Sequence, residues 1–235
     1  FDQVTFSYHP GTPVLQDIQL SISEGERVAV VGPTGSGKTS LINLLVRFYD
    51  PSHGRVLINN RPLTALDIIA VRRRMALVTQ DPLLFSGTIA ENIRFGNPSL
   101  SHDDLMQVIK NAHCKDLIAK LPGKLDFVLT GGKEALSSGE RQLISIARAF
   151  ARDPALLILD EATSYIDSET EQHIQDALNM LMRHRTTLIV AHRLSTAREA
   201  HRIVVIIQGR IVETGTHEEL IRLRGFYYRL GQLQN

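Results

Sequence analysis

Short runs of apolar residues recur along the chain. Residues 28–31, 155–159 and 203–207 are almost entirely apolar, and the segment TTLIVAH at residues 186–192 repeats the pattern. Runs of this length without alternation are typical of strands that a sheet buries on both faces. Helical patterns separate the later runs, and this order predicts a mostly parallel sheet in an α/β fold.

The N-terminal part of the chain has a different pattern. Residues 1–8 alternate apolar and polar side chains, residues 18–22 cluster apolar ones, and turn-forming residues around Gly11 lie between them. The segment GRVLINNRPL predicts a hairpin that turns at Asn59 and Asn60. We therefore expect an antiparallel β subdomain in this part.

Helical spacing dominates from residue 82 to about residue 153. Ser101 and Asp104 have the spacing of a capping box. The apolar residues that follow share one helical face: Leu105, Val108, Ile109 and Ala112. The C-terminal segment THEELIRLRGFYYRLGQL predicts two surface helices separated at Gly225.

These patterns predict one domain in three parts. Residues 1–80 hold the antiparallel subdomain and the first part of the core, residues 81–153 form a helical subdomain, and residues 154–235 complete the core. No apolar run approaches the roughly 20 residues of a membrane-spanning helix.

The composition narrows the class of protein. Lys and Arg number 26 and Asp and Glu 25, a formal charge of +1, so we expect no nucleic-acid partner. The single cysteine, Cys114, has no partner for an internal disulfide, and no secretory signal opens the sequence, which favours a reducing compartment.

A glycine-rich segment directly follows the first buried strand. GPTGSGKT at residues 32–39 matches GxxxxGK[ST] between a strand and a helical pattern. In such a loop the backbone amides turn towards phosphate oxygens, Lys38 reaches the β and γ phosphates, and Thr39 gives its hydroxyl to Mg²⁺. The simpler alternative is a glycine-rich turn that starts a helix.

A pair of carboxylates ends the later apolar strand LLILDE. Asp160 is suited to a magnesium shell, and Glu161 to activating a water molecule. Acidic residues are common at strand ends, so this interpretation depends on the phosphate loop. Tyr8 and His192 are candidates for base stacking and γ-phosphate contact, although each has an ordinary structural interpretation in isolation. Gln80 lies where the sheet portion gives way to the helical one, and in isolation it is typical of a turn residue.

The segment ALSSGERQL begins another helix. Ser137 and Glu140 have capping-box spacing, and the apolar residues after them lie on one face: Leu143, Ile146, Ala147 and Phe150. A capping box explains the helix start but not the adjacent Ser138 and Gly139.

Together these motifs resemble those of the ATP-binding cassette (ABC) family over essentially the whole chain. In that family they are the A-loop (Tyr8), Walker A, the Q-loop (Gln80), the signature, Walker B, the D-loop (SYID, with Ser164 and Asp167) and the H-loop (His192). The resemblance implies a P-loop NTPase core and ATP-binding residues at Tyr8, Gly32, Pro33, Thr34, Gly35, Ser36, Gly37, Lys38, Thr39, Ser40 and Gln80.

The resemblance also implies chemistry and partners. Glu161, His192 and Lys38 are the expected catalytic residues, and Thr39, Gln80 and Asp160 the expected magnesium ligands. The expected partners are a second cassette and a transmembrane domain fused N-terminally, at the cytoplasmic face of a membrane. The signature residues of one cassette are expected to complete the ATP site of the other: Leu136, Ser137, Ser138, Gly139 and Glu140.

The segments QDPLLFSGTIAENIRFG and GRIVETGTHEEL are similar to the exporter branch, so the expected function is ATP hydrolysis that drives export. The signature reads LSSGE where the family usually has LSGGQ, and the VGERG-like loop of exporters is missing. A chromosome-maintenance ATPase and a P-loop small-molecule kinase are the alternatives. The first would carry long heptad arms before the signature, and the second would need neither a signature helix nor His192.

Overall fold

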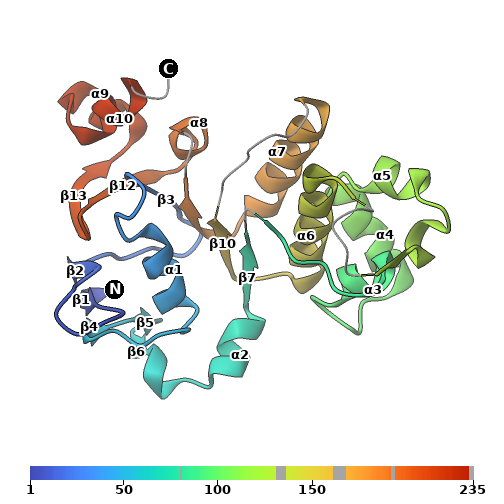
Figure 1. Ribbon diagram of the computed structural model, residues 1–235, viewed down its shortest axis with the longest axis horizontal. Helices are drawn as coiled ribbons and strands as arrows, with labels where there is room; N and C mark the ends of the chain where they lie inside the picture. The colour runs from blue at the N-terminus through green and yellow to red at the C-terminus, as the bar shows by residue number, and fades with distance from the viewer. Residues whose placement is uncertain (80, 131–135, 161–167, 192–193, 233–235) are drawn as a thin grey trace. The chain divides into compact units, whose positions relative to one another are not determined.

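The computed structural model describes residues 1–79, 81–130, 136–160, 168–191 and 194–232 of the chain. Its contacts divide into two units (Figure 1). Unit 1 comprises Phe1–Met75, Ile158–Ala162 and Thr186–Asn235, and unit 2 comprises Ala76–Leu157 and Thr163–Arg185. The division at residues 80 and 153 that the sequence suggests stays a prediction.

The apolar runs form the larger sheet of unit 1. Strand β3 (Arg27–Val31) pairs in parallel with β11 (Thr186–Val190) on one side and with β12 (Arg202–Ile207) on the other. Strand β13 (Arg210–Gly215) pairs antiparallel with β12, and β10 (Leu156–Asp160) follows β11 in strand order. Because β3 is buried from Val28 to Val31, only apolar side chains fit both of its faces. The predicted α/β fold with a mostly parallel sheet is confirmed.

A separate antiparallel sheet in unit 1 has the order β2-β1-β4. Its strands are β1 (Asp2–Phe6), β2 (Leu15–Ile18) and β4 (His53–Arg55). The strand predicted at residues 18–22 was wrong in its position, because β2 ends at Ile18. Leu20 is buried without belonging to a strand, and its N–H donates to the carbonyl of Phe1.

The predicted hairpin at Asn59 and Asn60 is confirmed. It joins β5 (Leu57–Ile58) to β6 (Arg61–Pro62) in antiparallel register. Both asparagines have positive φ, 49° and 61°, as a two-residue hairpin turn requires. Asparagine tolerates this left-handed conformation better than most residues.

Five α-helices and one 3-10 helix complete the described part of unit 1. Helices α9 and α10 lie next to each other after β13, with Gly225 between them as predicted (Figure 1). They are not purely superficial, since Leu220 and Tyr227 are fully buried. The helices are α1 (Lys38–Leu45), η1 (Leu63–Ala65), α2 (Ile68–Arg73), α8 (Leu194–Arg198), α9 (His217–Leu223) and α10 (Phe226–Gln232).

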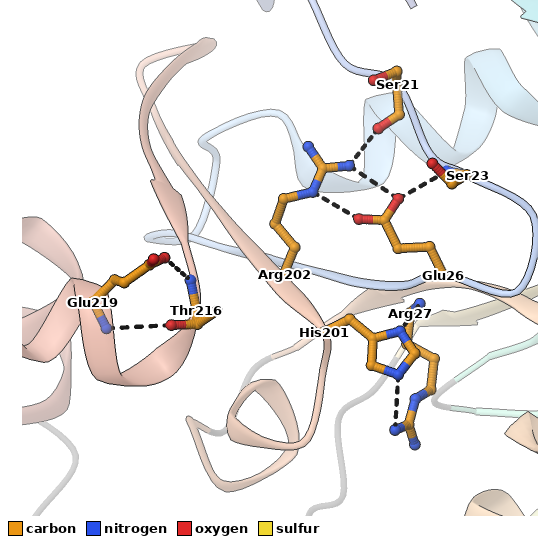
Figure 2. A network of polar contacts seen from close by, with 8 residues as sticks. All are labelled: Ser21, Ser23, Glu26, Arg27, His201, Arg202, Thr216 and Glu219. Carbon is orange, nitrogen blue, oxygen red and sulfur yellow. Dashed lines mark hydrogen bonds and ion pairs between the residues drawn. The ribbon is translucent and has the colours of Figure 1, made fainter.

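A polar network joins the beginnings of β3 and β12 (Figure 2). The Arg202 guanidinium donates to both carboxylate oxygens of Glu26, at 2.8 and 3.1 Å, and to the carbonyl of Ser21. Glu26 also accepts the N–H of Ser23 at 2.8 Å. The network ties the strand that leads into the glycine-rich loop to its neighbour.

Helix α6 (Ser138–Arg152) is the centre of unit 2. It packs against α3 (Ile89–Arg94), α4 (His102–Asn111) and α7 (Ser168–Met182). Nine of its residues are buried, on more than one face, because neighbours cover it from several sides. The other elements of this unit are β7 (Met75–Val78) from its second residue onward, β8 (Gly87–Thr88), α5 (Lys115–Lys120), η2 (Lys124–Asp126) and β9 (Val128–Leu129).

Arg148 of α6 contacts α3 and the segment that precedes it. Its guanidinium donates to the carbonyls of Leu83 and Asn92 and to the side-chain oxygen of Asn92. The rings of Phe85 and Phe95 lie 5.0 and 5.6 Å from its central carbon. Burial lowers the pKa of Arg148. Within the described ranges, no helix has the length and apolar character needed to cross a membrane.

Candidate nucleotide-binding site

The glycine-rich loop lies between β3 and α1, as the motif predicts. Gly37, the residue before α1, has φ 105°, and a Cβ built there would lie 2.6 Å from the Leu15 side chain. Gly32 has φ 153°, and a Cβ there would lie 2.1 Å from the carbonyl oxygen of Ile206. Larger residues at either position would collide with the fold. The tight loop therefore depends on glycine at both of its ends.

Lys38 points back into this loop from the first position of α1. Its Nζ donates to the carbonyls of Gly32 at 2.8 Å and Pro33 at 2.9 Å, and only 6% of the residue is exposed. Burial lowers the pKa of Lys38, and the negative charge of Asp160 opposes that shift. A buried ammonium group that faces carbonyls but has little solvent is suited to an anionic ligand.

The start of α1 adds further attraction for an anion. No side chain caps Gly37, and the first turn contains no acidic residue, so the helix dipole is not neutralised there. The hydroxyl of Ser36 is buried and has no hydrogen-bond partner among the described residues. Thr39 is exposed and Ser40 is buried. These features fit a phosphate group.

Tyr8 lies beyond the end of β1, with 41% of its surface exposed. Its hydroxyl contacts Ser40 Oγ at 3.1 Å and accepts from Asn43 Nδ2 at 3.0 Å. Phe6 and Tyr49 meet its ring edge to face. Sequence reasoning missed Asn43 and Tyr49. The signal for Asn43 was a single polar side chain in the otherwise apolar run LINLLV.

Asp160 is the last residue of β10 and belongs to the same unit as the loop. Its charge acts on Lys38, so the two side chains share one electrostatic environment. Its carboxylate and the Thr39 hydroxyl are hard oxygen donors, the type that Mg²⁺ prefers. The described residues contain no group of three or more His, Cys, Asp or Glu side chains that could hold a metal ion.

The capping box predicted at α6 is confirmed. Ser137 Oγ accepts the N–H of Glu140 at 3.2 Å, and Glu140 Oε2 accepts the N–H of Ser137 at 2.8 Å. Leu136 and Gly139 are buried, while Ser137 and Ser138 are exposed. The exposed serines lie at the start of a 15-residue helix. The predicted residues that lie outside the described ranges are Gln80, Glu161, Ser164, Asp167 and His192.

Comparisons with known proteins agree with the loop and the sheet. The ABC transporter family model matches residues 15–164. A fatty acid ABC transporter ATP-binding/permease protein of Mycobacterium bovis is 47% identical over 230 residues, which are 98% of this chain and 36% of that protein. The ATP-dependent lipid A-core flippase of Syntrophus aciditrophicus is 47% identical over 231 residues, 98% of this chain and 38% of the flippase.

A solved structure, that of a bacterial Atm1-family ABC exporter with ATP bound, is similar with a TM-score of 0.93 and 38% identity. The match covers 100% of this chain and 41% of the exporter chain, so this chain spans less than half the length of these relatives. The family model covers more than half of the chain, and the relatives align with almost all of it. This chain therefore belongs to the ABC transporter family and is a nucleotide-binding domain of that family.

Proposed function

We propose that this domain binds Mg·ATP and hydrolyses it to drive export through a transmembrane partner. The observation that carries the proposal is the buried Lys38 ammonium group inside a loop that only glycine can close. The unneutralised start of α1 adds a second attraction for the triphosphate. Tyr8 supplies an exposed aromatic face for adenine.

In this proposal the metal and the attacking water are held by residues around the γ-phosphate. Thr39, Gln80 and Asp160 would hold Mg²⁺, which would supply positive charge against the phosphate oxygens. Glu161 accepts a proton from the attacking water, and His192 supports the γ-phosphate. The first part is supported by two observations: Thr39 and Asp160 belong to the same unit, and the charge of Asp160 acts on Lys38, the neighbour of Thr39.

Two cassettes are proposed to close around ATP. The exposed serines at the start of α6 would then face the triphosphate that Lys38 of a second copy holds. Ser164 and Asp167 of the D-loop belong to the same assembly. A helix N-terminus with an available hydroxyl is an anion site, which supports this role.

The transmembrane partner is proposed to precede this domain in one polypeptide. The support is that relatives called ATP-binding/permease proteins align with this chain over only part of their length. The domain would then lie at the cytoplasmic face of the membrane. Against the chromosome-maintenance alternative, the longest helices among the described residues, α6 and α7, have 15 residues each and are too short for heptad arms.

The test measures ATP binding and phosphate release on matched variants. At ATP about a hundred times above its Kd, the unmodified chain should gain roughly 2.7 kcal/mol of stability. For a chain of this size that gain corresponds to about 5 °C in Tm. Lys38→Ala should lose this shift, whereas Lys120→Ala, an exposed lysine of α5, should keep it.

Glu161→Gln should keep the shift in Tm and lose phosphate release, because it retains the binding groups and removes the base. An undiminished shift in Lys38→Ala would contradict the binding site. Unchanged turnover in Glu161→Gln would contradict the proposed base.

A further inference from the structure

The hydroxyl of Tyr8 is held by α1, the helix that begins with Lys38. Asn43 Nδ2 donates to Tyr8 Oη at 3.0 Å, and Ser40 Oγ lies 3.1 Å from the same oxygen. An amide NH₂ group only donates, so Tyr8 Oη accepts from Asn43 and its own proton remains available for Ser40. Ser40 and Asn43 are three residues apart and therefore lie on one face of α1.

The ring of Tyr8 is fixed by its neighbours as well. The Phe6 ring lies 4.7 Å away at an angle of 78°, and the Tyr49 ring lies 5.1 Å away at 89°. These edge-to-face contacts hold the plane of the ring while 41% of the residue stays exposed. A side chain that is held at its tip and its sides, but is open to solvent, is prepared for a flat ligand.

The same helix carries the phosphate-binding residues. Lys38 and Thr39 occupy its first positions, and Ser40 follows directly. The distance between the phosphate loop and the Tyr8 ring is therefore set by one rigid element and two side-chain contacts. We propose that Ser40 and Asn43 are positioning residues, which fix the Tyr8 ring relative to the phosphate loop and so favour a nucleotide over a bare triphosphate.

This inference rests on the proposed nucleotide binding and adds the residues that select for the base. Asn43 would touch no nucleotide atom and would act through Tyr8. A purely structural role would change the stability of the domain but would not separate the affinities for ATP and for inorganic tripolyphosphate.

The experiment measures both affinities by titration calorimetry, with Mg²⁺ present, on the unmodified chain and its variants. Tyr8→Phe keeps the ring and removes its hydroxyl. Both Tyr8→Phe and Asn43→Ala should weaken ATP binding about fivefold, the factor expected from one lost hydrogen bond. Tripolyphosphate binding should stay within about twofold, since the phosphate loop is intact.

The double variant distinguishes positioning from structure. Once Tyr8→Phe has removed the hydroxyl, Asn43→Ala should cause no further loss of ATP affinity. Ser52→Ala is the matched control, because Ser52 accepts the N–H of Ser7 at 3.2 Å beside Tyr8 without touching its hydroxyl. This control should bind ATP as the unmodified chain does, and Tm measurements check that each variant is folded.

The inference is overturned if Asn43→Ala binds ATP normally, if ATP and tripolyphosphate weaken together, or if Ser52→Ala has the same effect. Equal affinity of the unmodified chain for ATP and tripolyphosphate would also overturn it while leaving the phosphate site intact. An unmodified chain that binds neither compound would overturn the proposed function as well.

Discussion

The ion pair between Arg202 and Glu26 gives a sharp test of what holds β3 beside β12. The side chains are 28% and 17% exposed, and the guanidinium donates to both carboxylate oxygens. Arg202→Met keeps the apolar stem of the side chain and removes the charged end. It also removes the hydrogen bond to the carbonyl of Ser21, whereas Glu26 keeps the hydrogen bond from the N–H of Ser23.

The expected loss follows from these contacts. Hydrogen bonds to charged groups contribute about 1.5–3 kcal/mol each, but water can reach both partially exposed side chains and replace part of the loss. We therefore expect Arg202→Met to lower the free energy of unfolding by about 2–3 kcal/mol. Since the entropy of unfolding is about 0.5 kcal/mol/K for a chain of this length, Tm should fall by about 4–6 °C.

The assay is thermal unfolding of the chain and of a double-mutant cycle with Glu26→Gln. Arg55→Met is the control, because Arg55 pairs with Asp2 at 2.7 Å but its side chain is 64% exposed. Such a surface pair should contribute about 0.5 kcal/mol or less. A Tm loss in Arg202→Met no larger than in Arg55→Met would refute this account of the network.

The pH dependence of the cycle is a further check. Burial raises the pKa of Glu26, but the hydrogen bonds from Arg202 and Ser23 and the positive charges of Arg202 and His201 outweigh it, so the pKa is lowered. The contribution of Glu26 is therefore complete above its pKa in the unfolded chain and is lost as the pH falls through its lower pKa in the folded chain. A coupling energy between the two residues that persisted below both values would contradict the electrostatic origin.

Four other residues give shorter tests. Burial raises the pKa of the Cys114 thiol to about 12, three units above the ordinary value of 9.0, so native Cys114 should react with iodoacetamide about a thousandfold more slowly than in the unfolded chain. Because the unfolded thiol ionises first, stability should fall as the pH rises from about 9 towards 12. Burial lowers the pKa of Lys38, so tripolyphosphate affinity should fall as the pH rises through that lowered value, measured by calorimetry below pH 10.5. Arg148→Met should lower the free energy of unfolding by about 2–4 kcal/mol in urea titrations, because it removes the guanidinium that donates to the carbonyl and the side-chain oxygen of the buried Asn92. Ser137→Asp keeps an N-cap residue and should change Tm by no more than about 1 °C. In a Glu161→Gln background, it should abolish ATP-dependent dimerisation measured by light scattering.

Local sequence patterns predicted the elements whose causes are themselves local. The apolar side chains of residues 28–31 avoid water only if the strand lies inside a sheet, and β3 has a neighbouring strand on each side. Asn59 and Asn60 adopt the left-handed conformation that their turn needs. Ser137 and Glu140 satisfy each other's backbone N–H groups within four residues of chain.

Other features depend on contacts that the local pattern does not contain. Leu20 is an apolar residue that the fold buries, but burial alone does not place a residue in a strand. Ser101 caps α4 through the N–H of Asp104, yet the Asp104 carboxylate accepts from the Ser101 hydroxyl instead of completing a reciprocal box. An aspartate side chain is one methylene shorter than the glutamate of a capping box.

The candidate site also contains residues that local patterns predict and residues that depend on distant contacts. The motif itself predicted the loop and Lys38, because phosphate binding requires a fixed spacing of glycines and lysine. The bond from Asn43 to Tyr8 joins residues 35 positions apart, and Tyr49 contacts the same ring from a further segment. No spacing rule connects these residues, so only the folded chain brings them together.

The capping role of Ser137 does not compete with a role at the triphosphate of a second copy. A serine hydroxyl carries one donor and two acceptor positions, and the N–H of Glu140 uses one acceptor position. Its proton therefore stays available for a phosphate oxygen. The N–H of Ser137 donates to the Glu140 carboxylate at 2.8 Å. This bond keeps the negative charge of Glu140 close to the hydroxyl proton of Ser137. In the proposed dimer Glu140, where the family usually has glutamine, would repel the phosphate to some extent, and the helix dipole and the Ser137 hydroxyl would have to outweigh that repulsion.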